Sequence, residues 1–165
     1  MTNTINHFES LKNILIENQV FPILKYWNKY ETTHFNYKPN RSETKKIIDE
    51  MKNTLGNKSG LYAYYKDGRL LYLGKGNPLF NRIRSHFNEA HNTSNPEDLW
   101  FSFFNNHSGS LVLYWIEIDD ENLEKEFEAV RVAYESILNV LDKPEFENYK
   151  QNRIKRRGSK KGEII

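Results

Sequence analysis

The chain has 165 residues, which is the length of one domain with a full hydrophobic core. It contains no cysteine, which excludes a disulfide scaffold and cysteine-ligated zinc and fits a reducing compartment. Its polar start and the absence of a long apolar run lead us to expect a cytoplasmic protein without a signal peptide or membrane span.

The charge is distributed unevenly, although the net value is only +2. Seven basic residues lie between Lys150 and Lys161, whereas the rest of the chain is slightly acidic. A basic end of this kind attracts polyanions, but it can also be a flexible, solvated tail over residues 151–165. If it binds nucleic acid, the candidate contacts are Lys150, Arg153, Lys155, Arg156 and Arg157.

Residues 1–57 are predicted to form a helical extension. Apolar residues at helical intervals predict a helix over residues 4–18, and a shorter aromatic helix follows over residues 20–30. Ser42 can cap a third helix, which Gly56 ends. We expect this extension to pack on the following domain, with a DNA-reading or dimerising role as the alternative.

A hairpin is predicted over residues 61–73, because aromatic and apolar strand residues flank an Asp67-Gly68 turn. The glycines that follow break the strand, and Asn77 can cap a helix that begins at Pro78. This arrangement leaves several polar side chains free to converge at one end of a small sheet.

Five such side chains form the candidate site: Tyr62, Tyr72, Lys75, Arg82 and His86. Phenols, cations and an imidazole in one cleft suit phosphodiester chemistry, because the reaction needs proton transfer and neutralisation of phosphate charge.

Residues 98–106 are densely aromatic and predict a short helix or turn, in which Trp100 either fills the core or stacks on a base. Residues 111–118 predict a third strand, and Asp119-Asp120 begins a long helix that cannot pass Pro144. We therefore predict an α/β (α+β) fold in which a small, mainly antiparallel three-stranded sheet is flanked by helices.

The triplets Gly60-Leu61-Tyr62 and Tyr72-Leu73-Gly74 resemble the two motifs of the GIY-YIG nuclease family, with leucine in place of isoleucine in both. The two tyrosines are ten positions apart, Arg82 lies ten beyond the second, and Arg84-Ser85-His86-Phe87 continues the pattern. The resemblance covers residues 58–150 and implies a nuclease domain there.

The resemblance implies an endonuclease that uses Mg²⁺ or Mn²⁺ to hydrolyse DNA, either duplex or branched, with RNA as another possible substrate. It implies that Glu135, nine residues before Pro144, binds the metal and that Asn148 completes the catalytic set. Glu128 is the fallback ligand. The alternative function is a nucleic-acid-binding module of the same fold that has lost catalysis.

The resemblance also implies that one tyrosine takes the proton from water. A free phenol has a pKa near ~10, and lowering it by ~3 units requires about 4 kcal/mol of stabilisation. We favour Tyr62 as this base and assign phosphate or water binding to Tyr72. Arg82 would grip the phosphate, while Arg84 is either an ordinary surface residue or a DNA contact, and His86 would assist the tyrosine.

Overall fold

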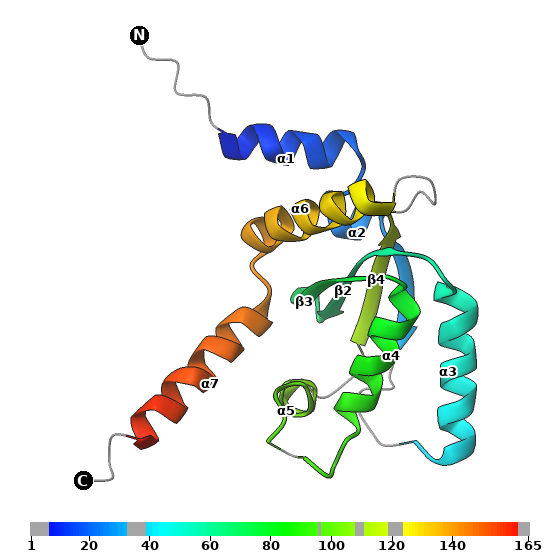
Figure 1. Cartoon of the computed structure of the whole chain (residues 1–165), viewed down its shortest axis with the longest axis vertical. Coiled ribbons are helices and arrows are strands. Elements are labelled where there is room, and N and C mark those ends of the chain that lie inside the picture. Colours follow the sequence, from blue (N-terminus) through cyan, green and yellow to red (C-terminus); the bar gives the residue numbers. More distant parts are fainter. Residues whose placement is uncertain (1–6, 33–38, 96, 108–110, 119–123, 162–165) are drawn as a thin grey trace.

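A computed structural model of the chain describes residues 7–32, 39–95, 97–107, 111–118 and 124–161, with side chains as far as Ile154 (Figure 1). Helices flank a four-stranded antiparallel sheet in the order β1-β4-β2-β3, which confirms the predicted α+β class. The elements in chain order are α1 (His7–Glu17), α2 (Ile23–Tyr26), β1 (Asn28–Thr32), α3 (Arg41–Leu55), β2 (Gly60–Lys66), β3 (Arg69–Gly76), α4 (Leu79–Ala90), α5 (Leu99–Asn106), β4 (Leu111–Glu117), α6 (Glu124–Asp142) and α7 (Glu145–Lys161).

The sheet has one strand more than the three predicted, and this strand comes from the N-terminal extension. Residues 28–32, of which we expected the first three to end a helix, form β1 and pair antiparallel with β4, with Lys29 opposite Tyr114. The expected helix is reduced to the single turn of α2. Because β1 is an edge strand with mostly exposed residues, its sequence lacks the apolar alternation of a half-buried strand.

The predicted hairpin is confirmed as β2 and β3. Asp67 and Gly68 both have positive φ values, 50° and 74°, as the tight turn of such a hairpin requires. The register contains a β-bulge, because Tyr65 lies opposite Leu70 whereas Tyr64 lies opposite Tyr72, so the intervening residue of β3 has no partner of its own. The bulge turns Tyr72 to the same side of the sheet as Tyr62 and Tyr64.

Both faces of the sheet are covered, so β2 is buried along almost its whole length. The first face carries Tyr62 and Tyr64 and packs against α3, α4 and α5. The second face carries Leu61 and Ala63 and packs against α1, α2 and α6. The β3 edge strand is contacted by α4 on the first face and by α6 on the second, so helices of both layers lie near this edge.

Helix ends differ slightly from the prediction. The α3 helix is capped by Asn40, not Ser42, through a reciprocal capping box in which Asn40 and Glu43 exchange hydrogen bonds of 3.0 and 2.9 Å. Gly56 ends α3 as predicted, with a φ of 53°. Asn77 does not cap α4, because its side chain accepts a 2.7 Å hydrogen bond from Ser59.

The α6 helix stops before Pro144, as predicted, and a new helix begins at once. Lys143 adopts a left-handed conformation with a φ of 47°, which turns the chain into α7. The segment that we predicted to be a flexible tail is helical through Lys161, and its far end projects away from the sheet in Figure 1. The predicted start of α6 at residues 119–120 lies outside the described residues.

The first part of α7 docks on α5 through aromatic contacts. Phe146 stacks on Trp100, and Tyr149 packs against Phe103 and accepts a hydrogen bond from Asn106. Among the described helices, none combines the length and the apolarity needed to cross a bilayer.

Candidate active site

The candidate site is built around β3, the edge strand of the sheet. Tyr72 lies on the first face, opposite Tyr64, whereas Lys75 lies opposite Leu61 and therefore points to the second face. The α4 helix brings Arg82 and His86 to the first face, and α6 covers the second face along the same edge. Residues from both faces therefore meet where the sheet ends.

The two predicted catalytic tyrosines are in contact but differ in exposure. Tyr62 is completely buried, whereas Tyr72 is partly exposed. Their hydroxyls lie within hydrogen-bonding reach of each other, and their ring centroids are 5.8 Å apart. A Cβ at Gly74 would approach both hydroxyls, to 2.7 Å for Tyr72 and 2.9 Å for Tyr62. Glycine at this position therefore leaves the space in which the two phenols meet.

The electrostatic environment favours ionisation of Tyr72 over ionisation of Tyr62. Burial raises the pKa of the Tyr62 phenol well above its ordinary value. Burial also raises the pKa of Tyr72, but its contact with the Tyr62 hydroxyl and the charge of Arg82 oppose this effect. Of the two phenols, Tyr72 is thus the better placed to lose a proton and to reach substrate.

His86 is fully buried on α4, and its Nε2 lies 2.7 Å from the Tyr62 hydroxyl. Burial lowers the pKa of the imidazole, and the nearby carboxylate of Glu89 partly opposes this shift. The predicted contact between His86 and a motif tyrosine is therefore present in the structure.

Arg82 extends from the surface of α4 over the two phenols. Its guanidinium donates hydrogen bonds to Tyr62 and Tyr72, and its Cζ lies 6.0 Å from the ring centre of Trp100. The residue as a whole is exposed, so it can also contact a phosphate that approaches from solvent.

Trp100 forms a wall of the site. Phe146 is stacked on it at a centroid distance of 4.3 Å and an angle of 7°, and His86 approaches it to 4.2 Å. Because protein rings already cover the indole, the contacts favour the core-filling role over base stacking.

Glu135 extends from α6 toward the same edge. Burial raises the pKa of this carboxyl, Lys75 and Arg82 oppose the shift, and Glu128 adds to it. Glu135 lines the same pocket as Tyr72, and its charge acts to raise the pKa of that phenol. The α6 carboxylate therefore lies in the same electrostatic cluster as the hairpin and α4 residues.

Glu128, the fallback ligand, is already engaged. It forms ion pairs with Lys75 and with Arg131, whose Nε lies 3.1 Å from the carboxylate. Arg131 is completely buried and donates a 2.7 Å hydrogen bond to the carbonyl oxygen of Ile118. The hydrogen bond from Lys75 lowers the pKa of Glu128 and so favours its charged form. Glu128 is therefore suited to position Lys75.

A pocket of about 250 Å³ opens beside this cluster. It is lined by Tyr72, Leu73, Trp100, Glu135, Asn139, Pro144, Phe146, Glu147 and Lys150. The pocket therefore connects the hairpin to the α6–α7 junction, and it combines aromatic walls with carboxylate, amide and ammonium groups.

The donor atoms around this pocket fit a hard divalent cation. Glu135, Asn139 and Glu147 offer oxygen atoms, and Glu135 forms no ion pair with another described side chain. Among the described residues, no group of three or more acidic or histidine side chains is assembled for a metal. Mg²⁺ commonly takes one or two carboxylates and completes its shell with water and substrate phosphate, so Glu135 is sufficient as a protein ligand.

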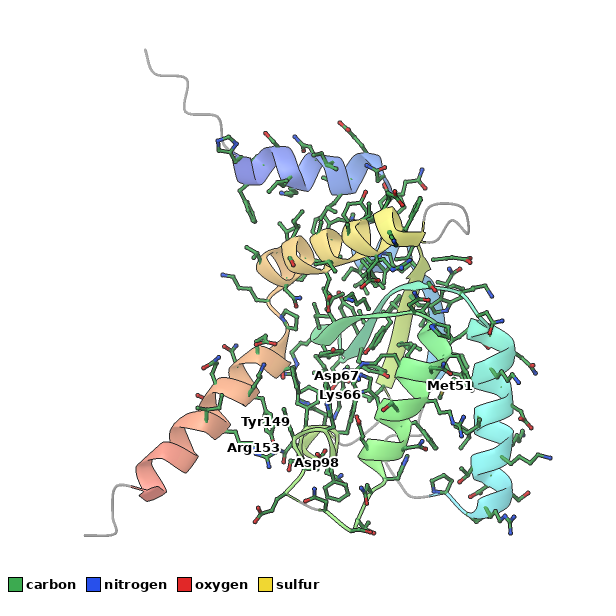
Figure 2. All side chains as sticks on the ribbon, in the orientation of Figure 1. Met51, Lys66, Asp67, Asp98, Tyr149 and Arg153 are labelled. Atoms are coloured by element: carbon green, nitrogen blue, oxygen red, sulfur yellow. The ribbon has the colours of Figure 1, made fainter. Side chains whose placement is uncertain are left out.

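The remaining predicted residues lie farther from the cluster. Asn148 is exposed on α7 and does not line the pocket, although its neighbour Glu147 does. Arg84 is exposed on α4. In Figure 2, Tyr149 and Arg153 lie between α7 and α5, near Asp98, and Arg153 approaches Ser102 to 3.4 Å. The predicted contacts Lys155, Arg156 and Arg157 lie on α7 beyond the described side chains.

Two residues near the site were not predicted. Glu89 lies one turn beyond His86 on α4, with its Oε2 3.4 Å from the imidazole Nδ1. Asn139 lies one turn beyond Glu135 and shares the pocket with it. The helical spacing of each to a predicted residue, three and four positions, is a signal that the sequence contains.

The chain is similar over part of its length to UvrABC system protein C from several bacteria. It is 42% identical over 52 residues to the protein of Flavobacterium johnsoniae, a match that covers 31% of this chain and 9% of the relative. It is 48% identical over 42 residues to that of Flavobacterium psychrophilum, covering 25% and 7%.

The protein of Campylobacter jejuni is 44% identical over 45 residues, covering 27% of this chain and 8% of the relative. The matches thus span less than a tenth of the length of these curated relatives. No family model and no solved structure matches the chain.

Proposed function

We propose that this protein is a divalent-metal-dependent endonuclease that hydrolyses DNA phosphodiester bonds with a GIY-YIG-type active site. The main support is the pocket that Glu135 from α6 shares with Tyr72, in reach of the charges of Lys75 and Arg82, although these three residues lie more than fifty positions earlier in the chain. The partial similarity to UvrABC system protein C is consistent with a nuclease-related module.

Each residue has a role that follows from its position. Glu135 would hold Mg²⁺ or Mn²⁺ in the pocket, where such a cation would supply activation of water and neutralisation of phosphate charge. Arg82 grips phosphate oxygens with its planar guanidinium, and Lys75 supplies a second positive charge. Tyr72, not Tyr62, faces the pocket and is the phenol that accepts the proton of the attacking water.

DNA would approach along α7. Lys150 lines the pocket beside Glu135 and also a second hollow of about 450 Å³ between α5 and α7, which Arg153 shares. A backbone that passes both hollows would reach the reacting groups while it follows a helix whose later turns carry five further basic residues.

The test is nicking of a supercoiled plasmid in the presence and absence of Mg²⁺ or Mn²⁺. We expect metal-dependent nicking that falls by a factor of about 10²–10³ in Glu135→Gln, because one group that stabilises the transition state is lost. Glu126→Gln is the matched control, since this carboxylate also lies on α6 but is exposed and does not line the pocket.

Nicking by Glu135→Gln at the wild-type rate would refute the metal assignment. If the wild-type protein shifts DNA in a gel but does not cleave it in the presence of Mg²⁺ or Mn²⁺, the protein is instead a binding module. The same assay with an RNA of matched sequence decides between the two nucleic acids.

A further inference from the structure

The side chain of Glu89 contacts the buried imidazole of His86 from the side opposite Tyr62. The Glu89 Oε2 atom and the His86 Nδ1 atom are both buried and lie 3.4 Å apart. Neither atom forms a hydrogen bond within the described part of the chain, and each is the ion-pair contact of the other. Since buried polar atoms are almost always paired, we take this contact as the pairing of the two atoms. The other oxygen of Glu89 accepts a 3.2 Å hydrogen bond from Ser85.

This contact determines which nitrogen of the neutral imidazole carries the proton. A carboxylate only accepts hydrogen bonds, so a bare Nδ1 facing Glu89 would bring two lone pairs together. With the proton on Nδ1, the Nε2 atom is an acceptor, and the Tyr62 hydroxyl at 2.7 Å must donate to it. The Tyr62 oxygen is then left to accept the hydroxyl of Tyr72.

We propose that Glu89 is a positioning residue, which holds His86 in the tautomer whose Nε2 accepts the proton that Tyr72 and Tyr62 pass on during hydrolysis. This proposal rests on the nuclease function proposed above. The four groups form one continuous chain, from Tyr72 at the pocket through two buried side chains to Glu89 on the outer side of α4.

The proton balance of the step is complete. As the water oxygen bonds to phosphorus and the bond from phosphorus to the leaving oxygen breaks, one water proton moves to the Tyr72 oxygen. The Tyr72 proton moves to the Tyr62 oxygen, and the Tyr62 proton moves to His86 Nε2. The leaving oxygen takes a proton from solvent, and His86 returns its extra proton to solvent along the same chain before the next turnover.

The surroundings of His86 explain why an imidazole is needed at the end of this chain. Burial makes each phenolate costly, as described above, whereas an imidazole titrates near neutral pH. The ionisable groups that face His86 are Tyr62 and Tyr64 on β2, Tyr72 on β3, and Arg82 and Glu89 on α4; from α5 it meets the uncharged rings of Trp100 and Phe104. Glu89 is thus the group among them that stabilises a protonated imidazole.

The experiment combines nitrogen NMR of the histidine rings with nicking kinetics on the full chain. In ¹⁵N-histidine-labelled protein, with His86 assigned by loss of its signal in His86→Gln, we expect the Nδ1–H tautomer in the wild type. In Glu89→Ala we expect the Nε2–H form to appear and kcat for nicking to fall about 10–100-fold with little change in KM.

Glu89→Gln separates positioning from charge, because its amide oxygen still accepts the Nδ1 proton. We expect this variant to keep the Nδ1–H tautomer and to recover part of the activity, with the lower limb of the pH–kcat profile moved to lower pH. Asn88→Ala, an exposed change on the same helix, is the control and should match the wild type.

An Nε2–H tautomer in the wild type, or a Glu89→Ala variant with unchanged kcat and tautomer, overturns the proposal. The NMR measurement needs no substrate. If the wild type nicks nothing, the nuclease function and the relay fail together, whereas the tautomer still decides whether Glu89 positions His86.

Discussion

The two sides of the candidate site differ in how their polar groups are satisfied. Tyr62 and His86 form a buried side, and each has partners within the protein. Glu135, Arg82 and Lys150 form an open side, which borders the pocket or solvent. The buried side is therefore fixed within the protein, whereas, on the proposed function, a metal ion and a phosphate would compensate the charges of the open side.

This difference predicts two kinds of variant. A change on the open side should reduce activity and leave the stability of the fold unchanged or higher, because binding groups are held at a cost to the free protein. A change on the buried side should reduce both, because partners lose their hydrogen bonds. The following predictions test the division, beginning with the largest effect.

Gly74→Ala should give the largest loss. An added Cβ would strike the hydroxyls of both Tyr62 and Tyr72, so the phenols must separate. We expect nicking to fall by more than a factor of about 10² and the free energy of unfolding to fall by roughly 1–3 kcal/mol. Plasmid nicking and urea unfolding measure the two effects.

The control for this variant is Gly68→Ala in the hairpin turn. A Cβ there has open space but a φ of 74°, so the strain should destabilise the fold by about 1–2 kcal/mol without disturbing the site. Equal losses of activity in the two variants would show that stability alone controls nicking.

Arg131→Met should mainly affect stability. The guanidinium is completely buried and bonds both Glu128 and the Ile118 carbonyl, so its loss leaves polar groups without partners. We expect the free energy of unfolding to fall by about 3 kcal/mol in urea melts. Arg84→Met, at an exposed position, should change it by less than about 0.5 kcal/mol. An Arg131→Met protein with wild-type stability would show that Arg131 is not needed to hold Glu128, and through it Lys75, in place.

Truncation after Ile154 should weaken DNA binding without loosening α7. Phe146, Tyr149 and Arg153, which dock α7 on α5, remain in this variant. If the removed basic turns neutralise ~4 phosphates, the slope of log affinity against log salt should become shallower by about 3 to 4. Fluorescence anisotropy with a labelled duplex at several salt concentrations measures this, and an unchanged slope would assign no DNA contact to residues 155–165.

Glu135→Gln should alter the pH dependence of stability by a small amount. Burial raises the Glu135 pKa in the folded protein, so the folded state binds the proton more tightly than the unfolded state. The charged carboxylate therefore destabilises the fold above this raised pKa, and the penalty disappears below the unfolded value of roughly 4.3.

We accordingly expect Glu135→Gln to be more stable than the wild type near pH 7, with the difference vanishing near pH 4. Thermal melts across this range measure it. A variant that is less stable at neutral pH would contradict the division, because Glu135 would then be held by favourable partners within the protein.

The sequence predicted the parts of the fold that depend on local chemistry. The hairpin turn at Asp67-Gly68 and the glycine end of α3 are correct because only a few residues adopt those conformations. The Tyr62–His86 contact and the approach of Glu135 were also predicted, since the motif spacing identified the residues and the elements bring them together.

Other features depend on tertiary context and were missed. The polar β1 strand is stabilised by pairing with β4, and no pattern in residues 28–32 indicates that pairing. The basic segment after Lys150 resembles a solvated tail in composition, but it continues α7, whose first turns are docked on α5 by Phe146 and Tyr149. The spacing of Glu89 to His86 indicates a shared helix face, but the burial of its Oε2 atom beside the imidazole depends on the tertiary packing.

The β-bulge in β3 explains the number of residues between the two motif tyrosines. Without a bulge, the residue numbers of each pair across this two-residue turn would add up to an odd number, as they do for Lys66 and Arg69. The partner of Tyr62 would then be residue 73, and residue 72 would point to the opposite side of the sheet. One extra residue changes odd to even and allows an interval of ten to place both phenols together. An even interval between the two tyrosines therefore requires the bulge. Removing one residue from the hairpin turn while the bulge remains would shorten the interval to nine and would leave both phenols on the same side of the sheet.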